Sequence, residues 1–127
     1  MTNPSEEPLI MPAPEPSGFV NTLNSMGYMT STLDPFSKAF TEFAPKAPGR
    51  SLDIGAAYGV ASLVALKNGA TLISNDIDPR HLKILASCVP PADRDRLTLV
   101  AGDFPDNIDF PEGSLGAMLI CRVMHFF

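Results

Sequence analysis

The sequence predicts an α/β fold in which a parallel β-sheet is flanked by helices on its faces. From residue 50 onward, short apolar segments typical of strands alternate with segments of about ten residues typical of helices. Glycine and proline mark most of the transitions between them. Because connections between parallel strands are almost always right-handed, this alternation leaves few possible topologies.

The N-terminal part differs in composition. Residues 1–17 are rich in proline and glutamate and hold few large apolar side chains, so we expect a flexible leader. Residues 18–49 are expected to form an N-terminal helical segment. Its clearest helix begins at Asp34-Pro35, where Asp is a typical N-cap and Pro suits the first turn. Four residues of that helix form an apolar stripe predicted to pack on the sheet: Phe36, Ala39, Phe40 and Phe43.

Residues 50–127 carry the regular pattern and are predicted to form the main domain. Asn68-Gly69 and Pro90-Pro91 supply the expected ends of its two helices. The expected strands are Ser51–Ile54, Thr71–Asn75, Leu97–Val100 and Leu115–Val123, and the expected helices are Tyr58–Lys67 and Asp78–Cys88.

Composition and charge exclude several classes of function. The 127-residue chain has a net charge of −5, which argues against an extended nucleic-acid-binding surface and favours a small-molecule substrate. The longest apolar run, residues 115–120, is too short to cross a membrane, so we expect a cytoplasmic protein. Cys88 and Cys121 are expected to be small buried hydrophobic residues. His81 and His125 are too isolated to indicate a metal site.

Three loops follow the first three expected strands, at the end of a parallel sheet where ligands bind. In the first, Gly55 permits a sharp turn and the next helix points its free N–H groups into the crevice. In the second, Asp76 lies where a carboxylate can accept both hydroxyls of a ribose. In the third, Asp103 can accept a hydrogen bond from an exocyclic amine, and Phe104 can cover an aromatic ring. Together the loops describe an adenosine-sized site.

The glycine spacing discriminates between adenosine ligands. A dinucleotide site needs G-x-G-x-x-G, but the second and third positions are Ala57 and Val60. Asp53 would repel a phosphate and would favour a cation, such as an ammonium or a sulfonium. These residues favour S-adenosylmethionine over a dinucleotide and disfavour a nucleotide-dependent oxidoreductase.

Residues 52–127 resemble the first half of a class I S-adenosylmethionine-dependent methyltransferase with a Rossmann-like fold. Asp53-x-Gly55-x-x-x-Gly59 resembles that family's Asp/Glu-x-Gly-x-Gly-x-Gly loop, residues 110–118 resemble F-P-D-x-S-F-D-A-V, and residues 122–125 resemble R/N-V-L-H. The resemblance implies a cofactor site made of Asp53, Gly55, Ala56, Ala57, Tyr58, Gly59, Asp76, Ile77, Asp103, Phe104 and Arg122. His125 is the candidate catalytic base.

Two departures bear on this resemblance. Ala57 replaces the middle glycine of the loop, which strains the turn if φ is positive there. Four strands are predicted where the family has seven, so we expect an incomplete fold that belongs to a longer protein or leaves an open sheet edge for self-association.

These expectations leave two functions open. The first is methyl transfer to a small-molecule acceptor, and the alternative is a non-catalytic methyltransferase-like module or an inactive fragment. We expect no metal.

Overall fold

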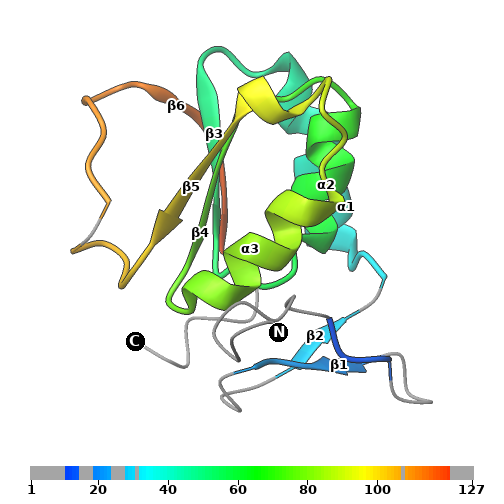
Figure 1. Ribbon diagram of the computed structural model, residues 1–127. Coiled ribbons are helices and arrows are strands. Elements are labelled where there is room, and N and C mark those ends of the chain that lie inside the picture. Colours follow the sequence, from blue (N-terminus) through cyan, green and yellow to red (C-terminus); the bar gives the residue numbers. More distant parts are fainter. Residues whose placement is uncertain (1–10, 15–18, 24–27, 31, 107, 121–127) are drawn as a thin grey trace.

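The computed structural model describes residues 11–14, 19–23, 28–30, 32–106 and 108–120, and contains two β-sheets (Figure 1). In the larger sheet every neighbouring pair of strands is parallel, in the order β5-β4-β3-β6, which confirms the predicted parallel sheet. The smaller sheet is an antiparallel pair, β1 with β2. The strands are β1 (Phe19–Asn21), β2 (Tyr28–Thr30), β3 (Arg50–Ile54), β4 (Leu72–Asp76), β5 (Leu97–Ala101) and β6 (Leu115–Ile120).

Helices connect these strands where the sequence predicts them. The bounds are α1 (Pro35–Phe43), η2 (Ala44–Lys46), α2 (Val60–Lys67), α3 (Pro79–Cys88) and η3 (Arg94–Arg96). Asp34 caps α1, its side chain accepting a 2.8 Å hydrogen bond from the Ser37 amide, and Asp78 caps α3 in the same way. The residues expected to be helical between 18 and 49 therefore include β1 and β2 as well as α1.

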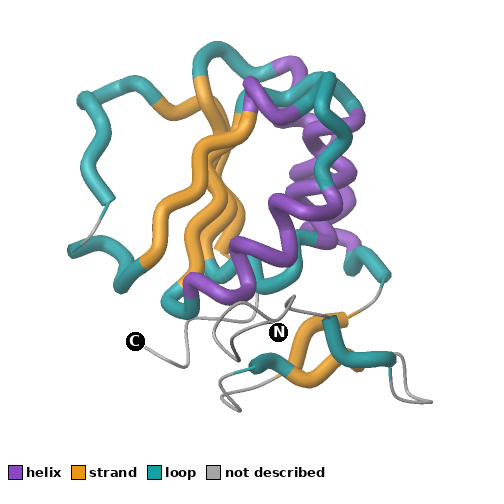
Figure 2. Tube along the Cα trace, viewed as in Figure 1, coloured by secondary structure: helices purple, strands orange, loops and turns teal. Residues whose placement is uncertain are grey.

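Helices α1, α2 and α3 all lie on one face of the larger sheet (Figure 2). The main core lies between these helices and the larger sheet and includes Phe40, Leu66, Leu72 and Leu85. A second core covers the other face, where the connection between β5 and β6 packs on Leu52, Ile54 and Ile73. The flanking helices that the sequence predicts are therefore present, and among the described residues they lie on one face, while irregular chain covers the other.

Two packing expectations are wrong in part. Of the apolar stripe on α1, Phe40 is 6% exposed, but Phe36 is 78% exposed and Phe43 is 55% exposed. Cys88 is exposed at the end of α3, where the sequence indicated a buried residue. The helical period groups such side chains on one face but does not show what covers them. Cys121 lies outside the described residues.

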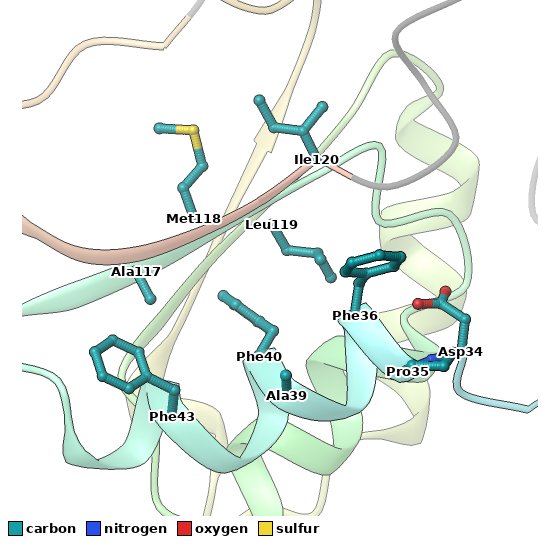
Figure 3. Close-up of a pocket in the computed structure, with 10 residues that line it drawn as sticks. All are labelled: Asp34, Pro35, Phe36, Ala39, Phe40, Phe43, Ala117, Met118, Leu119 and Ile120. Atoms are coloured by element: carbon teal, nitrogen blue, oxygen red, sulfur yellow. The ribbon is translucent and has the colours of Figure 1, made fainter.

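The exposed phenylalanines border an open groove between α1 and β6 (Figure 3). Ala117 and Leu119 point from β6 toward α1, whereas Met118 and Ile120 point to the other side of the strand. In the described part of the chain, the outer edge of β6 pairs with no further strand. The groove of about 780 Å³ follows that open edge. None of the described helices is both long and apolar enough to span a bilayer.

Candidate cofactor site

The three predicted loops meet at the carboxyl end of the larger sheet. β4 pairs in parallel with β3 on one side and with β5 on the other, so the carboxyl ends of all three strands lie at the same end of the sheet. Backbone hydrogen bonds join the loops directly, from Ala56 N to Asn75 O at 2.8 Å and from Gly102 N to Asp76 O at 3.0 Å. The side-chain amide of Asn75 also donates to the carbonyls of Val100 and Gly102. One connected framework therefore positions the loops.

The first loop turns through three residues with positive φ. Gly55 has φ 69°, Ala57 has φ 49° and Gly59 has φ 85°. The positive φ of Ala57 means that the turn is strained, because this region of backbone conformation is unfavourable for a residue with a Cβ. Gly59 also lacks room, since a Cβ would lie 2.1 Å from Leu85 Cδ1. The loop therefore lies directly against Leu85 of α3.

Asp76 ends β4 and accepts three hydrogen bonds within the protein. Its Oδ2 accepts from the Ala57 amide at 2.9 Å, and its Oδ1 accepts from the Asp78 amide and from His81 Nδ1, each at 2.9 Å. Asp76 is only 6% exposed. A carboxylate offers about four acceptor positions, so these three hydrogen bonds leave one position on Oδ2 unused.

His81 also belongs to this group of residues, although its isolated position in the sequence indicated no site. Its Nε2 accepts a 2.9 Å hydrogen bond from the Leu23 amide, 58 residues away. An amide can only donate, so Nε2 carries no proton and Nδ1 carries it toward Asp76. The Arg80 guanidinium donates to the Leu23 carbonyl at 3.1 Å and also binds Asp78. Both backbone groups of Leu23 are thereby held by α3.

Asp53 lies beneath the first loop and is 4% exposed. The Ser62 hydroxyl donates a 2.7 Å hydrogen bond to its Oδ2 and is 2.7 Å from the Ser74 hydroxyl. Burial raises the pKa of Asp53 to about 7, the Ser62 hydrogen bond opposes that rise, and the nearby Asp76 charge adds to it. Such a carboxyl gains from a cation placed near it. The two serines carry no sequence signal that distinguishes them from other small polar residues.

Tyr58 joins the first loop to the N-terminal part. It is 2% exposed and packs with Val20, Ile84 and the partly buried Leu23 in a small core of their own. Its ring meets that of His81 edge to face, with centroids 5.0 Å apart. Burial raises the pKa of the Tyr58 hydroxyl, the Asp78 charge raises it further, and a hydrogen bond with the Leu23 backbone lowers it. Tyr58 is therefore buried between the first loop, α3 and Val20.

The other predicted residues are more dispersed. Ile77 is 50% exposed directly after Asp76, and Asp103 is exposed after β5. Phe104 packs at the margin of the second core. Arg122 and His125 lie outside the described residues. Among the residues described, no group of three or more His, Cys, Asp or Glu side chains could hold a metal ion.

The carboxyl end of the larger sheet therefore gathers groups of different chemistry. Asp76 has an unused acceptor position, Ile77 beside it is an exposed apolar residue, and Asp53 is a buried carboxyl that favours a cation. Groups of these kinds can accept from a hydroxyl, contact an aromatic ring and attract an ammonium.

Comparison of the sequence with protein-family models and with curated proteins gives no match. Comparison of the structure with solved structures does give matches. The glycopeptide N-methyltransferase MtfA complexed with sinefungin is 22% identical, with a TM-score of 0.51, over 70% of this chain and 37% of that one. MtfA alone gives 27% identity and a TM-score of 0.49 over 68% and 41%. Protein arginine methyltransferase 10 of Arabidopsis thaliana gives 19% and 0.46 over 61% and 22%.

The first of these matches has a TM-score above one half, and at its sequence identity it establishes the fold. The chain spans about two fifths or less of the length of these three solved structures. Together with the parallel sheet and the order of its strands, the match confirms the expected fold class. The chain therefore has a Rossmann-like fold, which it shares with the glycopeptide N-methyltransferase MtfA.

Proposed function

We propose that this chain is the cofactor-binding part of an S-adenosylmethionine-dependent methyltransferase that acts on a small molecule. The observation that carries the proposal is the Asp76 carboxylate, held at the carboxyl end of β4 by the Ala57 amide with one acceptor position open. A ribose hydroxyl can donate to that position. The fold supports this assignment, because MtfA, which shares it, was crystallised with S-adenosylmethionine.

Asp53 gives the proposal its preference among adenosine ligands. A buried carboxyl favours a cationic partner and opposes a phosphate. S-adenosylmethionine brings an ammonium and a sulfonium, whereas a dinucleotide brings a pyrophosphate. The described chain holds no G-x-G-x-x-G turn, since Ala57 and Val60 stand at the second and third positions.

The residues of the site would then contact different parts of the cofactor. Asp76 would hold the ribose, Ile77 and Phe104 would contact the adenine, Asp103 would accept from its amine, and Asp53 would attract the methionine end. The bound cofactor would supply an electrophilic methyl group. Fixing it in one orientation is the main contribution such a site makes to the rate. His125 and Arg122 remain candidates for proton transfer and for orienting the substrate.

The small-molecule acceptor is proposed on the charge of the chain. A net charge of −5 disfavours an extended contact with nucleic-acid phosphates. A non-catalytic binding module with the same fold is the second candidate. It is favoured by the positive φ of Ala57, because strain at the turn nearest the cofactor would reduce affinity.

Calorimetric titration with S-adenosylhomocysteine tests the proposal. We expect saturable binding by the wild-type chain, none by Asp76→Ala, and unchanged binding by Asp95→Ala, which removes an exposed carboxylate outside the site. NAD should not bind. A folded wild-type chain that does not bind S-adenosylhomocysteine would overturn the proposal, and binding of NAD in its place would favour a dinucleotide site.

A further inference from the structure

Leu23, in the segment that carries β1 and β2, bonds with both of its backbone groups to side chains of α3 beside the predicted cofactor site. Its amide donates to His81 Nε2 at 2.9 Å, and its carbonyl accepts from Arg80 at 3.1 Å. Figure 1 shows β1 and β2 beyond the end of the larger sheet at which the strand arrows point and α3 begins. The segment therefore lies at the same end as the three loops.

Apolar contacts hold the same junction. Val20 is fully buried against Tyr58 and Ile84, in a core separate from the two that cover the larger sheet. Tyr58 belongs to the first loop and Ile84 to α3, so the segment contacts two of the elements that would surround a cofactor. We name the described residues 19–23 and 28–30 the cap.

His81 lies between the cap and Asp76. It is 1% exposed and bonded on both sides, donating from Nδ1 to Asp76 and accepting at Nε2 from Leu23. The proton on Nδ1 fixes the only tautomer that satisfies both partners. The His81 ring therefore links the Asp76 carboxylate directly to the cap.

We propose that His81 is a positioning residue that couples Asp76 to the cap, so that an adenosine ligand bound at Asp76 holds the cap more firmly over the site. The coupling rests on the proposed function, because it requires a ligand at Asp76. By thermodynamic reciprocity, a docked cap raises the affinity for the ligand by the same factor.

Two conservative variants separate the two hydrogen bonds of His81. In Asn the amide nitrogen is bonded to Cγ, as Nδ1 is in His. His81→Asn can therefore still donate to Asp76 but does not reach Leu23. The amide of Gln extends one atom further, so His81→Gln can still accept from Leu23 but loses the bond to Asp76. His81→Phe removes both bonds and keeps an aromatic ring beside Tyr58. Lys83→Asn, exposed on the same helix, is the control.

Amide hydrogen exchange measured by NMR, with and without saturating S-adenosylhomocysteine, tests the coupling. The Ala57 amide bonds Asp76 directly and reports on binding alone. In the wild type and in Lys83→Asn, we expect the ligand to slow exchange of both the Ala57 and the Leu23 amides, the latter by about 10-fold. In the three His81 variants the ligand should slow Ala57 but not Leu23. Without ligand, Leu23 should exchange rapidly in His81→Asn and His81→Phe and slowly in His81→Gln.

Two results would overturn the coupling while leaving the proposed function intact. One is a wild-type Leu23 amide that does not respond to a ligand that slows Ala57. The other is a Leu23 response that persists in His81→Phe. If neither amide responds in the folded wild-type chain, the proposed function itself fails, and the coupling fails with it.

Discussion

The Ser62 hydroxyl donates a 2.7 Å hydrogen bond to Oδ2 of Asp53, and both side chains are almost completely shielded from solvent. Ser62 belongs to α2 and Asp53 to β3, so this bond ties the first helix after the loop to the central strand. A single neutral donor does not compensate a buried negative charge, which is why the pKa of Asp53 rises to about 7. Two predictions rest on this pair.

The first concerns stability against pH. Because the folded pKa of Asp53 lies well above that of the unfolded chain, the folded state binds the extra proton between about pH 4 and pH 7. The free energy of unfolding should therefore fall as pH rises through that range and level off above it. Asp53→Asn should remove this dependence, a difference of about 2–3 kcal/mol between pH 5 and pH 8. Urea unfolding at both pH values measures it, and an equal loss in Asp53→Asn would refute it.

The second concerns the ligand. If an ammonium is bound near Asp53, the ionised carboxyl is the competent form, and its fraction increases about tenfold from pH 6 to pH 8. S-adenosylhomocysteine should bind about 10-fold more tightly at pH 8 than at pH 6. Asp53→Asn should bind weakly at both values, while Asp95→Asn should follow the wild type. Calorimetry at the two pH values decides it, and tighter binding at pH 6 would contradict the placement of the cation.

The sequence was sufficient to predict the sheet and the three loops. Alternating strands and helices indicated a parallel sheet, and Gly55 and Asp76, which lie at the carboxyl ends of two of its strands, are therefore expected at the same end of the sheet. The link from His81 to Leu23 could not be predicted, because it joins residues 58 positions apart and depends on how the cap folds back. The exposure of Phe36 could not be predicted for a related reason. Periodicity shows which residues share one face of a helix, but it does not show which part of the protein covers that face.

A pair of opposite substitutions tests the geometry of the first loop. Ala57→Gly relieves the cost of a positive φ at 49°, about 1–2 kcal/mol, and loses about 0.5–1 kcal/mol to added chain entropy. We expect it to be neutral or to stabilise by up to about 1 kcal/mol. Gly59→Ala should destabilise by more than about 2 kcal/mol, because it adds strain at φ 85° and a 2.1 Å contact with Leu85. Thermal unfolding ranks them, and a stabilised Gly59→Ala would contradict the loop geometry.

The open edge of β6 leads to the last prediction. Met118 is 44% exposed on a strand without charged residues, and Phe36 and Phe43 extend the apolar surface on the α1 side. Such an edge pairs readily with another chain, and a lysine on it is a usual protection. We expect concentration-dependent self-association in sedimentation velocity, reduced by Met118→Lys. Thr98→Lys places the same charge on β5, the opposite edge strand, and should leave the association unchanged. If both lysines reduce the association equally, the reduction is caused by the change in net charge and not by the β6 edge. If the protein is monomeric at all concentrations, the β6 edge does not pair.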